Sequence, residues 1–61
     1  MNTKLARLKR RLKAAHITQD RIAAEAMVTR FMVNHVLNGR AKSRFVMAAI
    51  ERLLAERDRA A

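Results

Sequence analysis

The stretch TQDRIAAEAMVTRFMVNHVLNG, residues 18–39, decides the fold of this chain. Thr18 and Thr29 each stand just before a helix-forming run, where a threonine side chain can accept a hydrogen bond from the first turn. Gly39 follows the second run, and glycine takes at no cost the positive φ that ends many helices. The stretch therefore predicts a pair of short helices joined by a tight turn. They are Gln19–Ala26 and Arg30–Asn38.

Apolar residues at helical spacing predict one further helix on each side of this pair. The first, Thr3–Ala15, has Asn2 or Thr3 as its cap. The last follows a cap at Ser43 and runs to about Arg57, with the clearest apolar stripe in the chain. The stripes are Leu5, Leu8 and Leu12 in the first helix, and Val46, Ala49, Ile50, Leu53 and Leu54 in the last. Residues 1–61 therefore predict one all-α domain, a compact bundle of four or five short helices.

The charge of the chain indicates a polyanionic partner. Its 61 residues include 14 Lys and Arg against five Asp and Glu, a net charge of +9. Six basic residues and no acidic one fall in residues 1–15, and such one-sided charge costs self-repulsion unless a partner neutralises it. The alternative is that these charges only solvate a helix face. There is no cysteine, and no apolar run approaches the ~20 residues of a membrane span, so we expect a cytoplasmic protein that binds no membrane.

The outer edge of the second helix in the pair carries side chains suited to recognising bases. A DNA major groove admits one α-helix, and a bent helix pair presents such a helix on a rigid support. Arg30 can bond guanine O6 and N7, and Asn34 can bond adenine N6 and N7. Each such bidentate pair contributes about 1–3 kcal/mol of discrimination. With His35 on the same edge, the pattern predicts sequence-specific binding to double-stranded DNA.

In order and spacing, this stretch resembles the helix-turn-helix of the lambda-repressor-like (XRE-type) family, which includes the phage Cro and repressor proteins. The matching positions are Gln19, Ile22, Ala23, Val28, Thr29, Val33, Val36 and the pair Asn38-Gly39. The segment VNHVLNGRAK is also similar to the headpiece of LacI-type repressors. The resemblance covers Thr18 to about Lys42 closely, and the flanking helices only by pattern.

The resemblance implies a Cro-like transcriptional repressor in a bacterial or phage-infected cell, although an activator or a recombination accessory factor would use the same surface. Such modules usually bind palindromic DNA as two-fold homodimers. The expected contacts to bases are Arg30, Phe31, Asn34 and His35, and those to the DNA backbone are Gln19, Thr29, Asn38, Arg40, Lys42 and Arg44. The candidate dimer surface on the last helix is Phe45, Met47, Leu54 and Ala55.

The turn of the helix pair departs from the family pattern, since Met27 replaces the family's glycine. An L-residue held in the left-handed conformation costs about 1–2 kcal/mol. Either the turn bears that strain, or the pair merges into one continuous helix from Gln19 to Asn38. Propensity alone permits the merged form, and only Thr29 argues for a break. We expect the bent form.

A second departure supports a rival function. Met27, Phe31 and Met32 are apolar at positions where the family usually has glycine or polar residues. An exposed apolar patch of this kind marks a protein-contact surface, although Phe31 could instead contact a thymine methyl group. The rival is a helical interaction or dimerisation protein that binds nucleic acid only non-specifically.

The sequence offers no constellation for catalysis or for metal binding. His16 and His35 have no cysteine or carboxylate at ligand spacing. Ser43 is better explained as a helix cap, and no catalytic triad or carboxylate pair can be assembled beside a sizeable pocket. We therefore expect no enzymatic activity, no cofactor and no small-molecule substrate.

Overall fold

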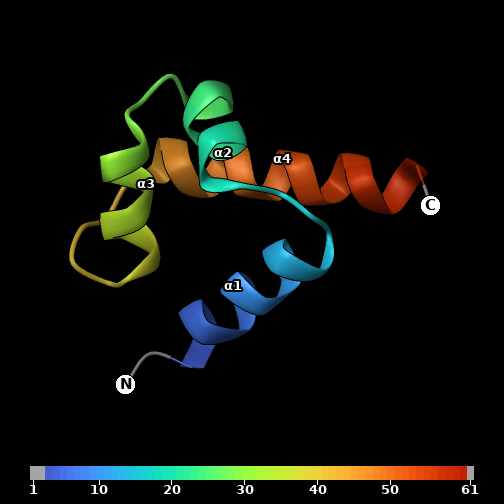
Figure 1. Cartoon of the computed structure of the whole chain (residues 1–61), viewed down its shortest axis with the longest axis horizontal. Helices are drawn as coiled ribbons and strands as arrows, with labels where there is room; N and C mark the ends of the chain where they lie inside the picture. The colour runs from blue at the N-terminus through green and yellow to red at the C-terminus, as the bar shows by residue number, and fades with distance from the viewer. Residues whose placement is uncertain (1–2, 61) are drawn as a thin grey trace.

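The computed structural model describes residues 3–60, with Ala60 described through its backbone alone, and these residues form four α-helices and no strand. The helices are α1 (Thr3–Ala14), α2 (Gln19–Ala26), α3 (Arg30–Leu37) and α4 (Arg44–Ala60). α2 packs on both α3 and α4, whereas α1 packs less closely, along one side of them (Figure 1). The all-α expectation is confirmed. None of these helices combines the length and apolar character needed to cross a bilayer.

The predicted apolar stripe of the last helix is buried, whereas in the first stripe only Leu12 is buried and Leu5 and Leu8 are half-buried. Ile22, Val33, Val46 and Ile50 are the largest side chains that are fully buried. Seven further apolar residues complete the buried cluster: Leu12, Ala23, Val36, Leu37, Ala49, Leu53 and Leu54. Within α1, Leu12 alone is buried, so this helix joins the core mainly through its C-terminal half.

Several helix ends differ from the prediction by a few residues. α1 and α3 each end one residue before the predicted position. At both ends the chain leaves the helix for a turn that backbone hydrogen bonds close. α4 continues to its bound at residue 60 instead of stopping near Arg57, since residues 58–60 contain no helix breaker. Thr3 lies inside α1 rather than at its cap, and the other candidate cap, Asn2, lies outside the described residues.

The other three predicted N-caps are confirmed. In each, a side-chain oxygen accepts a hydrogen bond from the backbone N–H three residues later, which contributes about 1 kcal/mol and fixes where the helix begins. Thr18 accepts from Arg21 at 3.1 Å, Thr29 from Met32 at 3.2 Å and Ser43 from Val46 at 3.3 Å.

α1, α2 and α3 end with the same pattern of backbone hydrogen bonds. His16, Met27 and Gly39 follow the three helices with positive φ values of 59°, 57° and 76°. After α2, the N–H of Val28 bonds the carbonyl of Ala23 at 3.0 Å, and the same six-residue pattern closes the other two ends. The bent form of the helix pair is therefore confirmed, and the continuous helix is wrong. Met27 itself bears the left-handed strain.

Replacing Met27 by glycine should stabilise the fold by about 1 kcal/mol, because glycine adopts positive φ without a Cβ clash. The Met27 side chain is 91% exposed, so its removal leaves no cavity. In a domain of this size, the gain corresponds to a rise in Tm of roughly 4–8 °C, which circular dichroism can measure. Met27→Ala is the matched control, since it removes the side chain but keeps the Cβ. Equal Tm values for the two variants would contradict the strain.

Candidate nucleic-acid interface

Two polar residues of α3 and one just past its end form a line. Arg30, Asn34 and Asn38 are spaced by four, so they lie above one another at intervals of one helical turn. All three are exposed. Nδ2 of Asn38 donates a hydrogen bond to Oδ1 of Asn34 at 3.1 Å, which joins the last two members. We refer to these three residues as the polar row.

Contacts from two other helices hold both ends of the polar row. At its start, Nε of Arg30 lies 3.8 Å from Oδ1 of Asp20, in the first turn of α2. At its end, Nζ of Lys9 in α1 donates to Oδ1 of Asn38 at 3.2 Å. An exposed ion pair contributes only about 0–1 kcal/mol, so the Asp20 contact orients Arg30 without locking it. The polar row is therefore presented on a support made by α1 and α2.

A second row on α3 is aromatic and lies next to the polar row. The ring centroids of Phe31 and His35 are 4.2 Å apart, with the ring planes inclined by 56°. His35 is half-buried, whereas Phe31 is 72% exposed, so the contact fixes the phenyl ring on the outside of the helix. Met27 and Met32 are also exposed. All three apolar residues of the rival prediction therefore lie at the molecular surface.

Two of the expected phosphate contacts lie at helix starts. Thr29 uses its hydroxyl oxygen as the cap acceptor, which leaves the hydroxyl hydrogen free to donate outward. Gln19, the first residue of α2, is half-buried and lines a small hollow with Lys9 and Lys13 of α1. Gln19 thus lies beside two cations, one of which holds the end of the polar row.

Three more expected phosphate contacts lie just past the end of α3. Arg40, Lys42 and Arg44 are all exposed. Lys42 and Arg44 line a hollow at Gly39 together with Lys4 of α1. Basic side chains from α1 and from the loop after α3 therefore surround the C-terminal end of α3.

Sequence reasoning missed two features of this surface. Lys9 enters the sequence prediction only as part of the charge of residues 1–15, because its bond to Asn38 spans 29 positions and no local spacing reveals it. Asp20 enters the sequence prediction only as one of the five acidic residues, yet it lies beside Arg30. The one-sided basic charge is the sequence feature most closely related to both contacts. An excess of cations makes it favourable for some of them to lie near acidic and amide groups.

The side chains gathered here are mostly hydrogen-bond donors. They offer guanidinium, ammonium and amide N–H groups, which complement the acceptors on phosphates and base edges. Comparison with models of known protein families, with curated proteins and with solved structures found no match for the chain. What this surface binds must therefore be inferred from its geometry and charge.

Proposed function

We propose that this chain binds double-stranded DNA sequence-specifically, as a Cro-like transcriptional repressor that reads the major groove with α3. In this proposal α2 and α3 act as a helix-turn-helix. The observation that carries it is the polar row, an exposed set of base-recognising side chains that contacts from Asp20 and Lys9 hold in place. A groove-reading helix needs side chains presented outward from a folded support, and these contacts orient the row without locking it. The net charge of +9 supplies attraction to a polyanion.

Arg30 and Asn34 are the proposed base readers of the polar row, with Phe31 and His35 beside them. Arg30 can leave Asp20 at small cost and form bidentate bonds to a guanine. Asn34 uses one lone pair of Oδ1 for Asn38. Its second lone pair remains for adenine N6–H, and its Nδ2 remains for adenine N7.

The proposed backbone contacts surround these readers and position them without specifying sequence. They are Gln19, Thr29, Asn38, Arg40, Lys42 and Arg44, and Lys9 joins them because only one of its three ammonium hydrogens is engaged by Asn38. A lone module reads few base pairs, so we propose that two copies bind a palindromic site.

Asn34→Ala should relax the base preference at one position of each half-site by about 1–3 kcal/mol, whereas Lys42→Ala should weaken binding to all sequences alike. Selection from random duplexes identifies the preferred site, and titration of its single-base variants measures the preference. Both side chains are exposed, so neither substitution opens a cavity in the core.

Arg57→Ala is the control for this experiment, since Arg57 lies near the far end of α4 from α3 and should affect neither affinity nor preference (Figure 1). A wild-type chain that selects no sequence would contradict the proposed function. An equal loss on every sequence for Asn34→Ala would remove Asn34 from the base readers.

The exposure of Met27 and Phe31 favours a second candidate function. Side chains that are 91% and 72% exposed, next to the half-covered Met32, make an apolar patch that a protein partner could bury. In that function, binding to nucleic acid is loose and sequence-independent.

Replacing thymine by uracil in the selected duplex distinguishes the two functions. If Phe31 contacts a thymine methyl, uracil at that position should weaken wild-type binding by about 0.8 kcal/mol, roughly fourfold. Phe31→Ala should remove this difference between thymine and uracil. No uracil effect at any position, together with self-association that Phe31→Ala abolishes, would favour the protein-contact function.

A further inference from the structure

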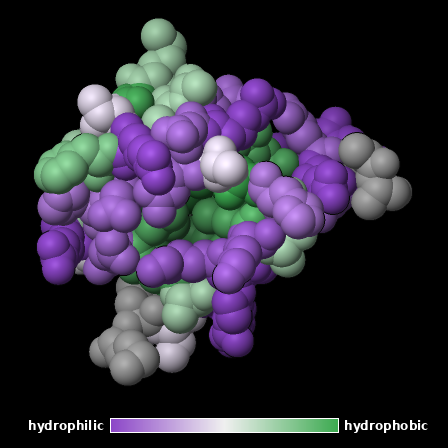
Figure 2. All heavy atoms as spheres, viewed as in Figure 1, coloured by the Kyte–Doolittle hydropathy of each residue, from purple (hydrophilic) through white to green (hydrophobic). Residues whose placement is uncertain are grey.

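A groove of about 330 Å³ separates α1 from α4. Its floor is apolar, made by Leu8 of α1 and by Met47, Ile50, Leu54 and Ala55 of α4. Figure 2 shows a hollow with a hydrophobic floor and hydrophilic borders where Figure 1 has the space between these helices. Three of the four residues expected to form a dimer surface lie in this floor, whereas Phe45 does not line the groove.

The groove stays open because α1 covers the core incompletely. α1 approaches the other helices less closely than α2 approaches α3 and α4. Leu8 is only half-buried although it belongs to the apolar stripe of α1. Ile50 and Leu54 of the floor are already buried, so a covering would add burial mainly at Leu8, Met47 and Ala55. A chain of this size buries only roughly 60% of its unfolded surface, so even this addition would stabilise it.

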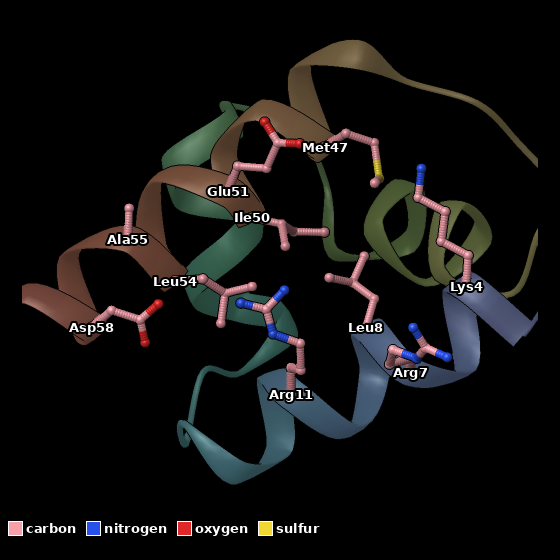
Figure 3. A pocket seen from close by; sticks show the side chains of 10 residues that line it. All are labelled: Lys4, Arg7, Leu8, Arg11, Met47, Ile50, Glu51, Leu54, Ala55 and Asp58. Atoms are coloured by element: carbon pink, nitrogen blue, oxygen red, sulfur yellow. The ribbon is translucent and has the colours of Figure 1, made fainter.

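The two edges of the groove carry opposite charges. The α1 edge is basic, with Lys4, Arg7 and Arg11, and the α4 edge is acidic, with Glu51 and Asp58 (Figure 3). The ion pairs found within residues 3–59 join other residues, so no ion pair connects the two edges within one copy. In Figure 3, Arg11 and Asp58 lie toward one end of the groove and Lys4 and Met47 toward the other.

This charge pattern is complementary to itself. When two copies face each other across a two-fold axis parallel to the groove, the basic edge of each lies opposite the acidic edge of the other. A two-fold axis perpendicular to the groove would set like charges against each other, which is unfavourable. We infer that the face around the α1–α4 groove is the homodimer interface, packed edge to edge against the same face of a second copy, with Arg7 and Arg11 of each chain facing Glu51 and Asp58 of the other.

This inference rests on the homodimer of the proposed function but not on DNA binding. At about 100° per residue, Lys9 lies about 160° around α1 from Arg7 and Arg11. Arg7 and Arg11 therefore lie on the opposite side of α1 from Lys9, which contacts the polar row, whereas Lys4 and Met47 line both the groove and the hollow at Gly39. A dimer through the groove leaves the polar row uncovered.

Two single charge reversals test the interface when they are mixed. Arg11→Glu and Asp58→Arg should each weaken the homodimer by about tenfold to a hundredfold, because both two-fold-related contacts become repulsive. In an equimolar mixture of the two variants, both contacts become attractive again, so a heterodimer near wild-type affinity should form. Sedimentation equilibrium without DNA, at moderate salt, measures the association of each variant and of their mixture.

Arg10→Glu and Glu56→Arg are the matched controls. They make the same charge changes on the same helices, at exposed positions that do not line the groove, and neither they nor their mixture should change association. Circular dichroism checks that each variant folds. If Arg11→Glu or Asp58→Arg does not fold, Arg7→Glu and Glu51→Arg provide the same mixing test.

A wild-type chain that stays monomeric at every concentration would overturn the inference. So would homodimers that the groove reversals leave intact, or a groove mixture that associates no better than the control mixture. Sedimentation is measured without DNA, so it tests the dimer alone. If a separate binding assay showed no duplex specificity while the dimer stayed intact, only the proposed function would be contradicted.

Discussion

Raising the salt concentration from 50 mM to 200 mM should weaken binding to the preferred duplex by about 10³-fold or more. Each cation that neutralises a phosphate releases condensed counterions, and the logarithm of the binding constant falls with a slope of about −0.9 per phosphate contact. Lys9, Arg40, Lys42 and Arg44 are exposed cations around the end of α3. About three such contacts per chain give a two-fold dimer about six, which accounts for the expected loss.

The slope of the logarithm of the binding constant against the logarithm of the salt concentration also distinguishes phosphate contacts from base contacts. Lys42→Ala should make it shallower by about one unit per chain, whereas Asn34→Ala should leave it unchanged because a neutral amide releases no counterion. Fluorescence anisotropy titrations at a series of salt concentrations give both numbers. Binding that stays constant between low and moderate salt would rule out the phosphate contacts proposed for these residues.

Ile22→Ala should remove most of the stability of the fold. Ile22 is fully buried and lines a hollow with Leu12 of α1 and Leu37 of α3, so three helices meet at its side chain. Truncating a buried isoleucine costs about 2–5 kcal/mol. A domain of this length has roughly 3–9 kcal/mol in total, at about 0.05–0.15 kcal/mol per residue. Urea denaturation followed by circular dichroism measures the difference.

Phe45→Ala is the control for this experiment, because Phe45 is large and apolar but 68% exposed. It should cost well under 1 kcal/mol, as surface substitutions usually do. A similarly small cost for Ile22→Ala would contradict the packing of α2 against α1 and α3. If duplex binding belongs to the folded state, saturating DNA should raise the Tm of the Ile22 variant.

The helices, three of their N-caps and most of the core were predictable from sequence because they depend on local spacing. Thr18, Thr29 and Ser43 each act within one turn, and the stripe from Val46 to Leu54 needs only the helical period. The sequence left two alternatives at Met27, a turn or a continuous helix. The strain of the turn, about 1–2 kcal/mol, is comparable to the conformational preferences that favour a break in the helix. Only packing of the two helices decides such a balance.

Contacts between distant segments could not be predicted in the same way. The bond between Lys9 and Asn38 depends on how α1 lies against α3, which neither local pattern encodes. The groove was missed for a related reason. Leu8 fits the apolar stripe of α1 and is therefore expected in the core, yet the distance of α1 from α4 leaves it half-buried.

In the proposed complex, the position of α1 between two surfaces would link dimerisation and duplex binding thermodynamically. Arg7 and Arg11 face the groove, whereas Lys9 on the opposite side of the same helix holds Asn38 at the end of the polar row. A second copy that steadies α1 also steadies Lys9. Because such coupling is reciprocal, the factor by which the dimer tightens duplex binding equals the factor by which the duplex tightens the dimer. Lys9 would then add to the cooperativity that two chains on one duplex already have.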